Sequence, residues 1–302
     1  MCYNRHVRGY VLGSIFIGIT VLWGGESVRI WEVIVLGLLQ GFTEFLPVSS
    51  SGHLVIAQDL LNISNPGVVL EIVLHLGTLF SVIIVFWTDI IGLLKGFVSL
   101  LLSPTGRRSM SRELVTYRKL VILLLVGIIP TAMFGLLLEP VFESLFSSVI
   151  AVGFALLLTG IVLFIISRLR PGQRDLSRAT FTDALVIGLA QGCAIVPGLS
   201  RSGMTISSAL ARGLTRDAAT RFSFLISIPT IAGAAVLKIG DIIHVSSGEE
   251  GSLLLLGFIM AALSGVLAIR LLVRLLKEGK LQVFAYYVWA LGIFTIWRAW
   301  RV

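Results

Sequence analysis

Long apolar runs separated by short polar stretches make up most of the chain. A membrane-spanning helix needs roughly 20 apolar residues, and runs that approach or exceed this length occur at 9–25, 68–87, 118–138, 149–167, 222–240, 252–274 and 282–300. After Trp87 the apolar pattern continues to Leu102, either as an extension of the helix at 68–87 or as a short separate helix. The pattern predicts an all-α polytopic membrane protein with about six to seven transmembrane helices.

The polar stretches between the runs differ in charge. Because loops on the cytoplasmic side of a membrane are rich in Lys and Arg, we expect the basic stretches to lie inside and the others outside. The C-terminal Arg298 and Arg301 then lie outside, against this bias. The basic stretches are 103–119, 168–178, 212–221 and 274–280, and the acidic or neutral ones are 139–148 and 241–251.

Two further apolar segments, 30–63 and 183–212, are each interrupted by proline. Both flanks of segment 183–212 are basic and therefore inside, so this segment must enter the membrane and return by the same face. It is predicted to form a re-entrant helical hairpin broken at Pro197-Gly198, with protein or a water-filled cavity around the irregular backbone. The same reasoning makes segment 30–63, broken at Pro47, a hairpin that enters from the outside.

The two hairpins resemble each other in sequence. GLLQG at 37–41 matches GLAQG at 188–192, and each is followed by a Pro, a Ser three residues later (Ser50 or Ser200) and a Ser-Gly pair. Each hairpin precedes three predicted spans, and the charges give the two triplets opposite directions. We therefore expect an inverted-topology repeat made of 28–170 and 180–302, whose broken helices meet near the membrane midplane.

Composition supports a membrane protein and excludes other classes. The 302 residues are 56% hydrophobic and only 13% charged, which argues against a soluble enzyme, a disordered chain or a disulfide scaffold. The net charge of +8 comes from short basic clusters between apolar runs, so nucleic acid is not the expected partner. Cys193, in an apolar stretch, is expected to be buried. Residues 1–27 form an extension, either an extra transmembrane helix or a signal-like segment.

Hairpin one carries several polar residues in an apolar context. Gln40 and Glu44 are four residues apart and share one helical face. Ionisable groups at membrane depth are costly and therefore indicate a functional site. The remaining polar residues of this cluster are Ser49, Ser50, Ser51 and His53.

Hairpin two carries an arginine at its break. Arg201 offers a planar fork of donors suited to phosphate. The helix that follows, from about Met204, presents free N–H groups and its positive end, which together favour an anion. The hydroxyls of Ser200, Ser202 and Thr205 add further donors beside Gly203.

An arginine cradle beside a Glu, Ser and His cluster predicts phosphoryl transfer. Ser50, His53 or a water is the candidate nucleophile, and Glu44 is a candidate base, orienting group or ligand of Mg²⁺ or Ca²⁺. Glu71 faces the site or makes a helix–helix hydrogen bond, and His75 is expected to be a packing residue. The open alternative is a lipid flippase or anion transporter, because inverted repeats with broken helices are typical of transporters.

QGFTEFLPVSSSGH at 40–53 and PGLSRSGMT at 197–205 resemble the two signatures of the undecaprenyl-diphosphate phosphatase, or bacitracin-resistance, family. The resemblance extends from about residue 28 to the C-terminus. It implies interlocked inverted repeats and a plasma-membrane enzyme that hydrolyses a polyprenyl diphosphate, reached from the outer face, to recycle the carrier lipid for cell-wall glycan. Its partners would be this lipid, the bilayer and, as an open expectation, a second copy in a homodimer.

The resemblance also implies roles for individual residues. Glu44 matches the essential second acid of an (E/Q)xxxE motif, and Arg201 matches the essential phosphate-binding arginine. Ser50 and His53 match the groups proposed for nucleophilic roles, and Gln40 stands where many members have Glu. The substrate-binding residues predicted around them are Gln40, Ser49, Ser51, Glu71, Gln191, Ser200, Ser202, Gly203 and Thr205.

Overall fold

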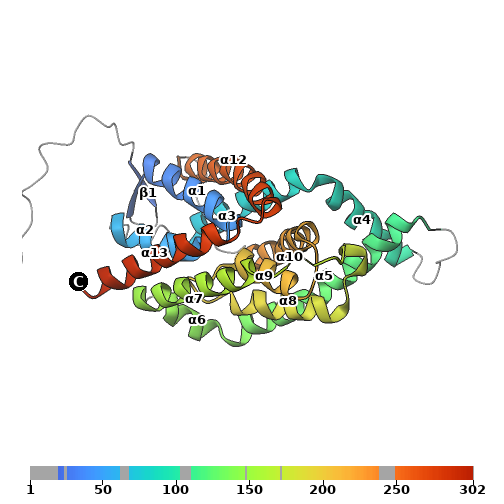
Figure 1. The fold of residues 1–302 in the computed structure, drawn as a ribbon. Helices are drawn as coiled ribbons and strands as arrows, with labels where there is room; N and C mark the ends of the chain where they lie inside the picture. The colour runs from blue at the N-terminus through green and yellow to red at the C-terminus, as the bar shows by residue number, and fades with distance from the viewer. Residues whose placement is uncertain are drawn as a thin grey trace, which may run out of the picture.

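A computed structural model describes residues 20–23, 26–61, 68–102, 110–146, 148–170, 172–237 and 249–301. Strands β1 (Thr20–Trp23) and β2 (Glu26–Arg29) pair antiparallel, and most of the remaining described chain is helical (Figure 1). The helices are α1 (Ile30–Phe45), α2 (Ser50–Leu61), α3 (Val68–Val85), α4 (Trp87–Leu102), α5 (Arg112–Leu137), α6 (Glu139–Phe146), α7 (Val149–Ser167), the 3₁₀ turn η1 (Leu176–Arg178), α8 (Phe181–Cys193), α9 (Arg201–Ala211), α10 (Arg216–Leu237), α12 (Glu249–Lys277) and α13 (Gln282–Ala299).

Four of the described helices are long and apolar enough to cross a membrane: α5, α7, α10 and α12. Helices α3 and α4 qualify together but bend by 88° at their junction, so the apolar stretch 68–102 forms two helices rather than one. The expected span at 282–300 forms α13, an 18-residue helix. The all-α polytopic class is confirmed, and the count of six to seven spans stays a prediction.

The N-terminal run at 9–25 is a case where sequence and structure differ. Residues 1–19 lie outside the described residues, so their predicted helix is not tested. Thr20–Trp23, at the end of the run, forms a strand and not the end of a helix. Its partner Glu26–Arg29 leads directly into α1. Valine and threonine in this segment favour extended backbone.

Both predicted hairpins are broken where proline and glycine occur. Helix α1 ends at Phe45, and Leu46, directly before Pro47, has extended φ/ψ of −64° and 143°, as the residue before proline prefers. In the second hairpin the chain leaves α8 after Cys193 and turns at Gly198, whose φ is +93°. A side chain at Gly198 would also collide with the backbone of Val152 on α7, so only glycine fits this turn.

The second helix of each hairpin begins with the same serine cap. The Ser49 hydroxyl accepts the Gly52 N–H at 3.2 Å, and the Ser200 hydroxyl accepts the Gly203 N–H at 3.1 Å. These caps satisfy N–H groups that a helix start leaves free. They align Ser49 with Ser200, which corrects the pairing of Ser50 with Ser200 expected from the proline spacing. Ser50 is instead equivalent to Arg201.

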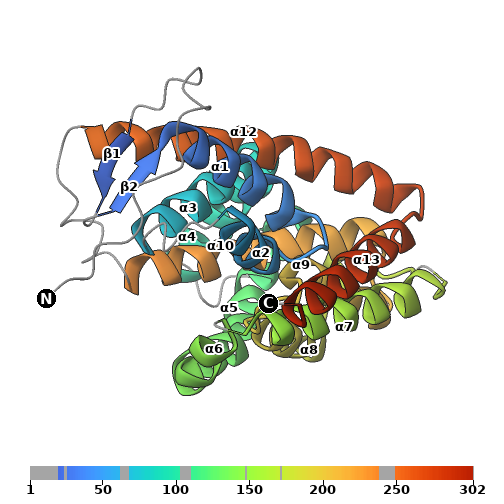
Figure 2. The ribbon, with the colours of Figure 1, turned by 90° about the vertical axis from the view of Figure 1, so that its left-hand side faces the viewer.

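Each hairpin packs against a long helix from the other half of the chain. Helix α1 lies along α12, and α8 lies along α5, while α7 packs on α13 (Figures 1 and 2). Glycines allow these close approaches: Gly37 faces Gly257 of α12, and Gly188 faces Gly127 of α5. Small residues at such contacts let helices pack tightly in a membrane. The halves are therefore interlocked, and their opposite orientation in a bilayer stays a prediction.

One face of α8 is directed outward from the protein. Leu185 and Leu189 are 42% and 46% exposed, and Cys193, one turn further, is also exposed. The expectation that Cys193 is buried is therefore wrong. Its apolar neighbours along the sequence belong to this outward face, which in a membrane protein contacts lipid rather than a protein core.

Candidate active site

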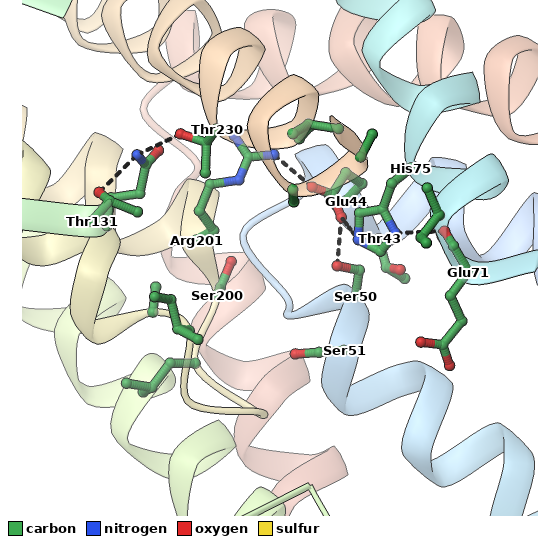
Figure 3. A pocket seen from close by; sticks show the side chains of 18 of the residues that line it. Thr43, Glu44, Ser50, Ser51, Glu71, His75, Thr131, Ser200, Arg201 and Thr230 are labelled. Atoms are coloured by element: carbon green, nitrogen blue, oxygen red, sulfur yellow. Dashed lines mark hydrogen bonds and ion pairs between the residues drawn. The ribbon is translucent and has the colours of Figure 1, made fainter. Parts of the chain in front are cut away.

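The breaks of the two hairpins face one cavity of about 530 Å³ (Figure 3). Its walls also include the first part of α3, the last part of α5 and α10, and the end of α6. Apolar side chains such as Ile72, Phe146 and Ile231 cover much of the wall. The polar lining residues are Thr43, Glu44, Ser50, Ser51, Glu71, His75, Thr131, Gln191, Ser200, Arg201 and Thr230.

Glu44 lies at the centre of the polar cluster and is only 7% exposed. Its Oε1 accepts a hydrogen bond from Arg201 Nη2 at 2.6 Å. Its Oε2 accepts from Ser50 Oγ at 2.6 Å and from Gln40 Nε2 at 2.9 Å. A buried carboxylate is stable only with such partners, so the two hairpins are joined through this one side chain.

Arg201 is the first residue of α9 and reaches across to hairpin one. Its Nη1 is buried and has no hydrogen-bond partner among the described residues. A guanidinium donor without a partner is costly in a buried site, and an oxyanion in the cavity would satisfy it. The α9 N-terminus adds its positive end at the same place.

Of the hydroxyl groups around Arg201, one lines the cavity and the others form hydrogen bonds within the protein. Ser200 lines the cavity while capping α9. Ser202 donates to the backbone carbonyl of Leu46 at 3.1 Å, which ties the two hairpin breaks together. Thr205 lies 2.6 Å from the Ser223 hydroxyl of α10 and is fully buried. Ser202 and Thr205 therefore hold the hairpin in place, and neither lines the cavity.

The structure does not bring His53 to the cavity. Its Nδ1 lies 2.7 Å from the carbonyl oxygen of Ser49. Its Nε2 lies 2.8 Å from the hydroxyl of Tyr287 on α13, and the two rings stack with centroids 5.6 Å apart. Both ring nitrogens are thus engaged, Nδ1 within hairpin one and Nε2 with α13.

The two equivalent glutamines have different partners. Gln40 donates to Glu44, and Gln191 donates to the hydroxyls of Thr131 and Thr230 at 3.0 and 2.9 Å. Thr131 also donates to the carbonyl of Gly188 at 3.1 Å. Gln191 therefore connects α8 with α5 and α10 at the cavity wall.

His75 is the clearest residue whose position sequence reasoning missed. Expected to be a packing residue, it lines the cavity with its Nε2 3.7 Å from Glu44 Oε2. Its neighbour Glu71 also lines the cavity, although the Glu71 carboxylate points away from Glu44 (Figure 3). The signal available in the sequence was an ionisable histidine one helical turn after an acidic residue, Glu71, within an apolar run. Thr131 and Thr230, in contrast, resemble ordinary packing threonines in the sequence.

The far ends of hairpin two are tied together by Asp183. This fully buried carboxylate accepts from Arg174 Nη1 and Arg212 Nε, both at 2.8 Å. It also forms a capping box with Thr180 at the start of α8. In hairpin one, Glu32 stands at the equivalent place and pairs with Arg29 at 2.8 Å. Each hairpin thus has an acid–arginine pair at its entrance.

The donor set around Glu44 is a poor resident metal site. Both Glu44 oxygens already accept hydrogen bonds from cationic or neutral donors. Within the described part of the chain, no three His, Cys, Asp or Glu residues are grouped as metal ligands. Mg²⁺ in proteins often has one or two carboxylate ligands and otherwise binds substrate phosphates, and Glu44 could supply such a ligand only after its hydrogen bonds rearrange.

Comparison with known proteins places this site in a family. A family model described as "bacitracin resistance protein BacA" matches residues 33–294. The undecaprenyl-diphosphatase of Halothermothrix orenii is 44% identical over 273 residues, covering 89% of this chain and 97% of the relative. That of Alkaliphilus metalliredigens is 43% identical over 271 residues, covering 88% and 97%. Undecaprenyl-diphosphatase 4 of Bacillus thuringiensis subsp. konkukian is 38% identical over 266 residues, covering 88% and 95%.

Proposed function

We propose a function for this chain from the premise that it belongs to the bacitracin resistance protein BacA family. The chain is a multi-pass membrane enzyme that hydrolyses undecaprenyl diphosphate to undecaprenyl phosphate and inorganic phosphate, which recycles the lipid carrier. The observation that carries this function is that Ser50 and Arg201 bind opposite oxygens of Glu44 inside one cavity.

Substrate binding begins with Arg201. The terminal phosphate of the diphosphate takes up its unpartnered Nη1 and the N–H groups at the start of α9. Because the phosphate competes with Glu44 for the guanidinium, substrate entry loosens the Arg201–Glu44 pair and frees Glu44 Oε1. The apolar wall of the cavity, including Phe146 and Ile231, leads the prenyl chain away from the diphosphate.

Chemistry begins at the Ser50 hydroxyl. Glu44 Oε2, which already accepts its hydrogen bond, takes the proton as Oγ attacks the terminal phosphorus. The bond between that phosphorus and the bridging oxygen breaks, and undecaprenyl phosphate leaves. Water then bonds to the phosphorus of the phosphoserine as the Oγ–P bond breaks, Ser50 recovers its proton from Glu44, and the water protons leave with inorganic phosphate. Arg201 stabilises the charge on the equatorial oxygens in both steps.

Ser50 is favoured over the other candidate nucleophiles by its position. It lines the cavity, is held 2.6 Å from a carboxylate and begins α2. His53 is bound to Ser49 and Tyr287 instead. Direct attack by a water on Glu44 uses the same base but produces no phosphoserine, so a trapping experiment separates the two routes.

The cavity is reached from the outer face of the plasma membrane in this proposal. Its walls come from the start of α3 and the ends of α5 and α10, which the distribution of basic loops places outside. Glu44 would be the side chain that holds a Mg²⁺ or Ca²⁺ accompanying the diphosphate, once its hydrogen bonds rearrange. The divalent ion would add charge neutralisation at the phosphates.

Transport is the alternative for this architecture. A transporter needs an anion-binding arginine but has no need of a hydroxyl held against a carboxylate. The test is phosphate release from undecaprenyl diphosphate in detergent micelles, where no second compartment exists. The parent should release phosphate, and Arg201→Ala and Glu44→Ala should each be at least about 10²-fold slower. A folded parent that releases none, with or without Mg²⁺ or Ca²⁺, would overturn the hydrolytic function.

A further inference from the structure

The side-chain amide of Gln191 on α8 has its orientation fixed by two threonines. Its Nε2 donates to the hydroxyls of Thr131 and Thr230 at 3.0 and 2.9 Å, and the dashed lines from the two threonines in Figure 3 mark these bonds. The Thr131 hydroxyl itself donates to the carbonyl of Gly188 at 3.1 Å. The Thr230 hydroxyl donates to the carbonyl of Ile226 at 2.9 Å. Because a hydroxyl has one proton to donate, both threonines can only accept from the amide, which must present its nitrogen to them.

This orientation leaves the Gln191 carbonyl oxygen as a buried acceptor in the wall of the active-site cavity. Oε1 has no hydrogen-bond partner among the described residues. The residue is only 1% exposed, and it lines the cavity. A buried acceptor is costly unless a donor reaches it. The oxygens of a fully ionised phosphate cannot donate, whereas a water molecule can.

Comparison of the two hairpins shows how this acceptor comes to serve the cavity. In hairpin one the equivalent glutamine, Gln40, donates to Glu44 four residues later. Its own Oε1 is also without a partner among the described residues, but Gln40 is not one of the cavity-lining residues. The residue four positions after Gln191 is Ile195, which lines the cavity. Helix α8 thus contributes an acceptor to the cavity but no base at the position that corresponds to Glu44.

The second step of the proposed hydrolysis needs an acceptor on the side of the cavity away from Ser50. The attacking and leaving groups of a phosphoryl transfer lie roughly in line through phosphorus. Undecaprenyl phosphate therefore leaves opposite Ser50, and the water that attacks the phosphoserine enters from that same opposite side. Figure 3 shows Ser50 on one side of Arg201 and the two threonines that hold Gln191 on the other. Glu44, hydrogen-bonded to Ser50, lies on the Ser50 side.

We propose that Gln191 Oε1 accepts a hydrogen bond from the hydrolytic water and orients this water for attack on the phosphoserine. This inference rests on the proposed function and on its covalent route. The water oxygen bonds to phosphorus as the Oγ–P bond of Ser50 breaks, Glu44 returns its proton to Oγ, and both water protons leave with inorganic phosphate. Gln191 takes up no proton, because its amide oxygen acts only as a hydrogen-bond acceptor. A glutamine amide orients the attacking water in GTPases in a similar way.

Two substitutions at Gln191 test this role through steady-state kinetics. Gln191→Met removes the acceptor with little change in side-chain length, and kcat should fall about 10- to 100-fold because the water is no longer oriented. KM should fall in proportion and kcat/KM should stay at the parental value, since only a step after phosphoserine formation is slowed. Gln191→Glu keeps an acceptor and should retain a higher kcat than Gln191→Met. Gln173→Met is the matched control at an exposed glutamine and should keep the parental kcat and KM.

The phosphoserine itself gives a second measurement. With substrate labelled in the terminal phosphate and an acid quench at steady state, the fraction of labelled chains should be several-fold higher in Gln191→Met than in the parent. The reason is that the phosphoserine still forms but is hydrolysed more slowly. A general disturbance of the site would instead lower kcat/KM and would not increase the label. Elution volume and thermal midpoint in detergent verify the fold of each variant.

The possible results separate this inference from the hydrolytic function. A folded Gln191→Met with parental kinetics overturns the inference, and so does one with a lower kcat/KM and no additional label. A parent that releases phosphate but never carries label overturns the covalent route and the inference together, while hydrolysis itself stands. A folded parent that releases no phosphate overturns the proposed function.

Discussion

Ser50 and Arg201 occupy the same position in the two hairpins and bind opposite oxygens of the Glu44 carboxylate. Each is the first residue of the second hairpin helix, directly after a capping serine, Ser49 or Ser200. The repeat thus supplies two equivalent helix starts facing one cavity. The difference at this single position gives one hairpin a hydroxyl and the other a guanidinium, which are the nucleophile and the phosphate-binding group of the proposed mechanism.

Replacing Ser50 tests the covalent route. With substrate labelled in the terminal phosphate and an acid quench, the parent should retain label on the protein, because a phosphoserine is stable to acid. Ser50→Ala should retain none and should release phosphate at least about 10²-fold more slowly. Ser51→Ala is the matched control, since Ser51 lines the same cavity without contacting Glu44. Unlabelled parent together with an active Ser50→Ala would assign the attack to water.

The planar shape of the Arg201 guanidinium, and not only its positive charge, should be important for phosphate binding. Arg201→Lys keeps a cation but offers the phosphate no planar pair of donors. We expect kcat/KM to fall about 10²-fold, measured as phosphate release over a substrate series. Arg178→Lys, an exposed position of η1, should be neutral. Parental kinetics in Arg201→Lys would contradict a bidentate role.

Sequence patterns predict the helices and the positions of their breaks better than they predict which residues of the two hairpins are equivalent. Proline at 47 and the Pro197-Gly198 pair identify both breaks, because these residues disturb helices regardless of tertiary context. The serine pairing was off by one residue, since the loop between Pro197 and Ser200 is not the same length as its equivalent after Pro47. The spacing of residues after each proline does not reveal this difference in loop length.

The roles of the two histidines illustrate what only tertiary packing decides. His53 lies within the signature stretch, yet α13 brings Tyr287 against it on the side away from the cavity. His75 lies outside both signatures, yet the packing of α3 beside α1 directs it to Glu44. The position of His53 is set by a helix far away in the sequence, for which the sequence contains no signal. For His75 the sequence offers only its place one turn after Glu71 in an apolar run.

The hydrogen bond between His53 and Tyr287 predicts a structural rather than a chemical role for this histidine. His53→Gln should reduce phosphate release at least tenfold less than Ser50→Ala, because neither ring nitrogen faces the cavity. Tyr287→Phe removes the same hydrogen bond from the other side and should lower stability by about 1 kcal/mol. The two changes together should cost little more than either alone. An inactive His53→Gln beside an active Tyr287→Phe would restore His53 as a candidate for the chemistry.

Asp183 should be important for stability rather than chemistry. Asp183→Asn removes the charge that holds Arg174 and Arg212 at the ends of hairpin two. Because both arginines are partly exposed, we expect a loss of about 2 kcal/mol, seen as a thermal midpoint several degrees lower in detergent. Asp175→Asn serves as control: a hydrogen bond from Ser177 lowers the pKa of the exposed Asp175 carboxyl, and among the described residues Asp175 forms no ion pair with an arginine comparable to those of Asp183. Equal thermal midpoints for the two variants would refute the stabilising role of the Asp183 ion pairs.

Removing divalent cations should affect substrate binding more than turnover. If the ion arrives with the diphosphate, EDTA should raise KM for undecaprenyl diphosphate several-fold while kcat changes little, and either Mg²⁺ or Ca²⁺ should restore binding. This follows from a Glu44 carboxylate whose oxygens are already hydrogen-bonded before substrate enters. Elemental analysis of the purified protein after gel filtration supplies the control, with much less than one divalent ion per chain expected. One tightly retained ion per chain, lost together with kcat on chelation, would instead establish a resident metal at Glu44.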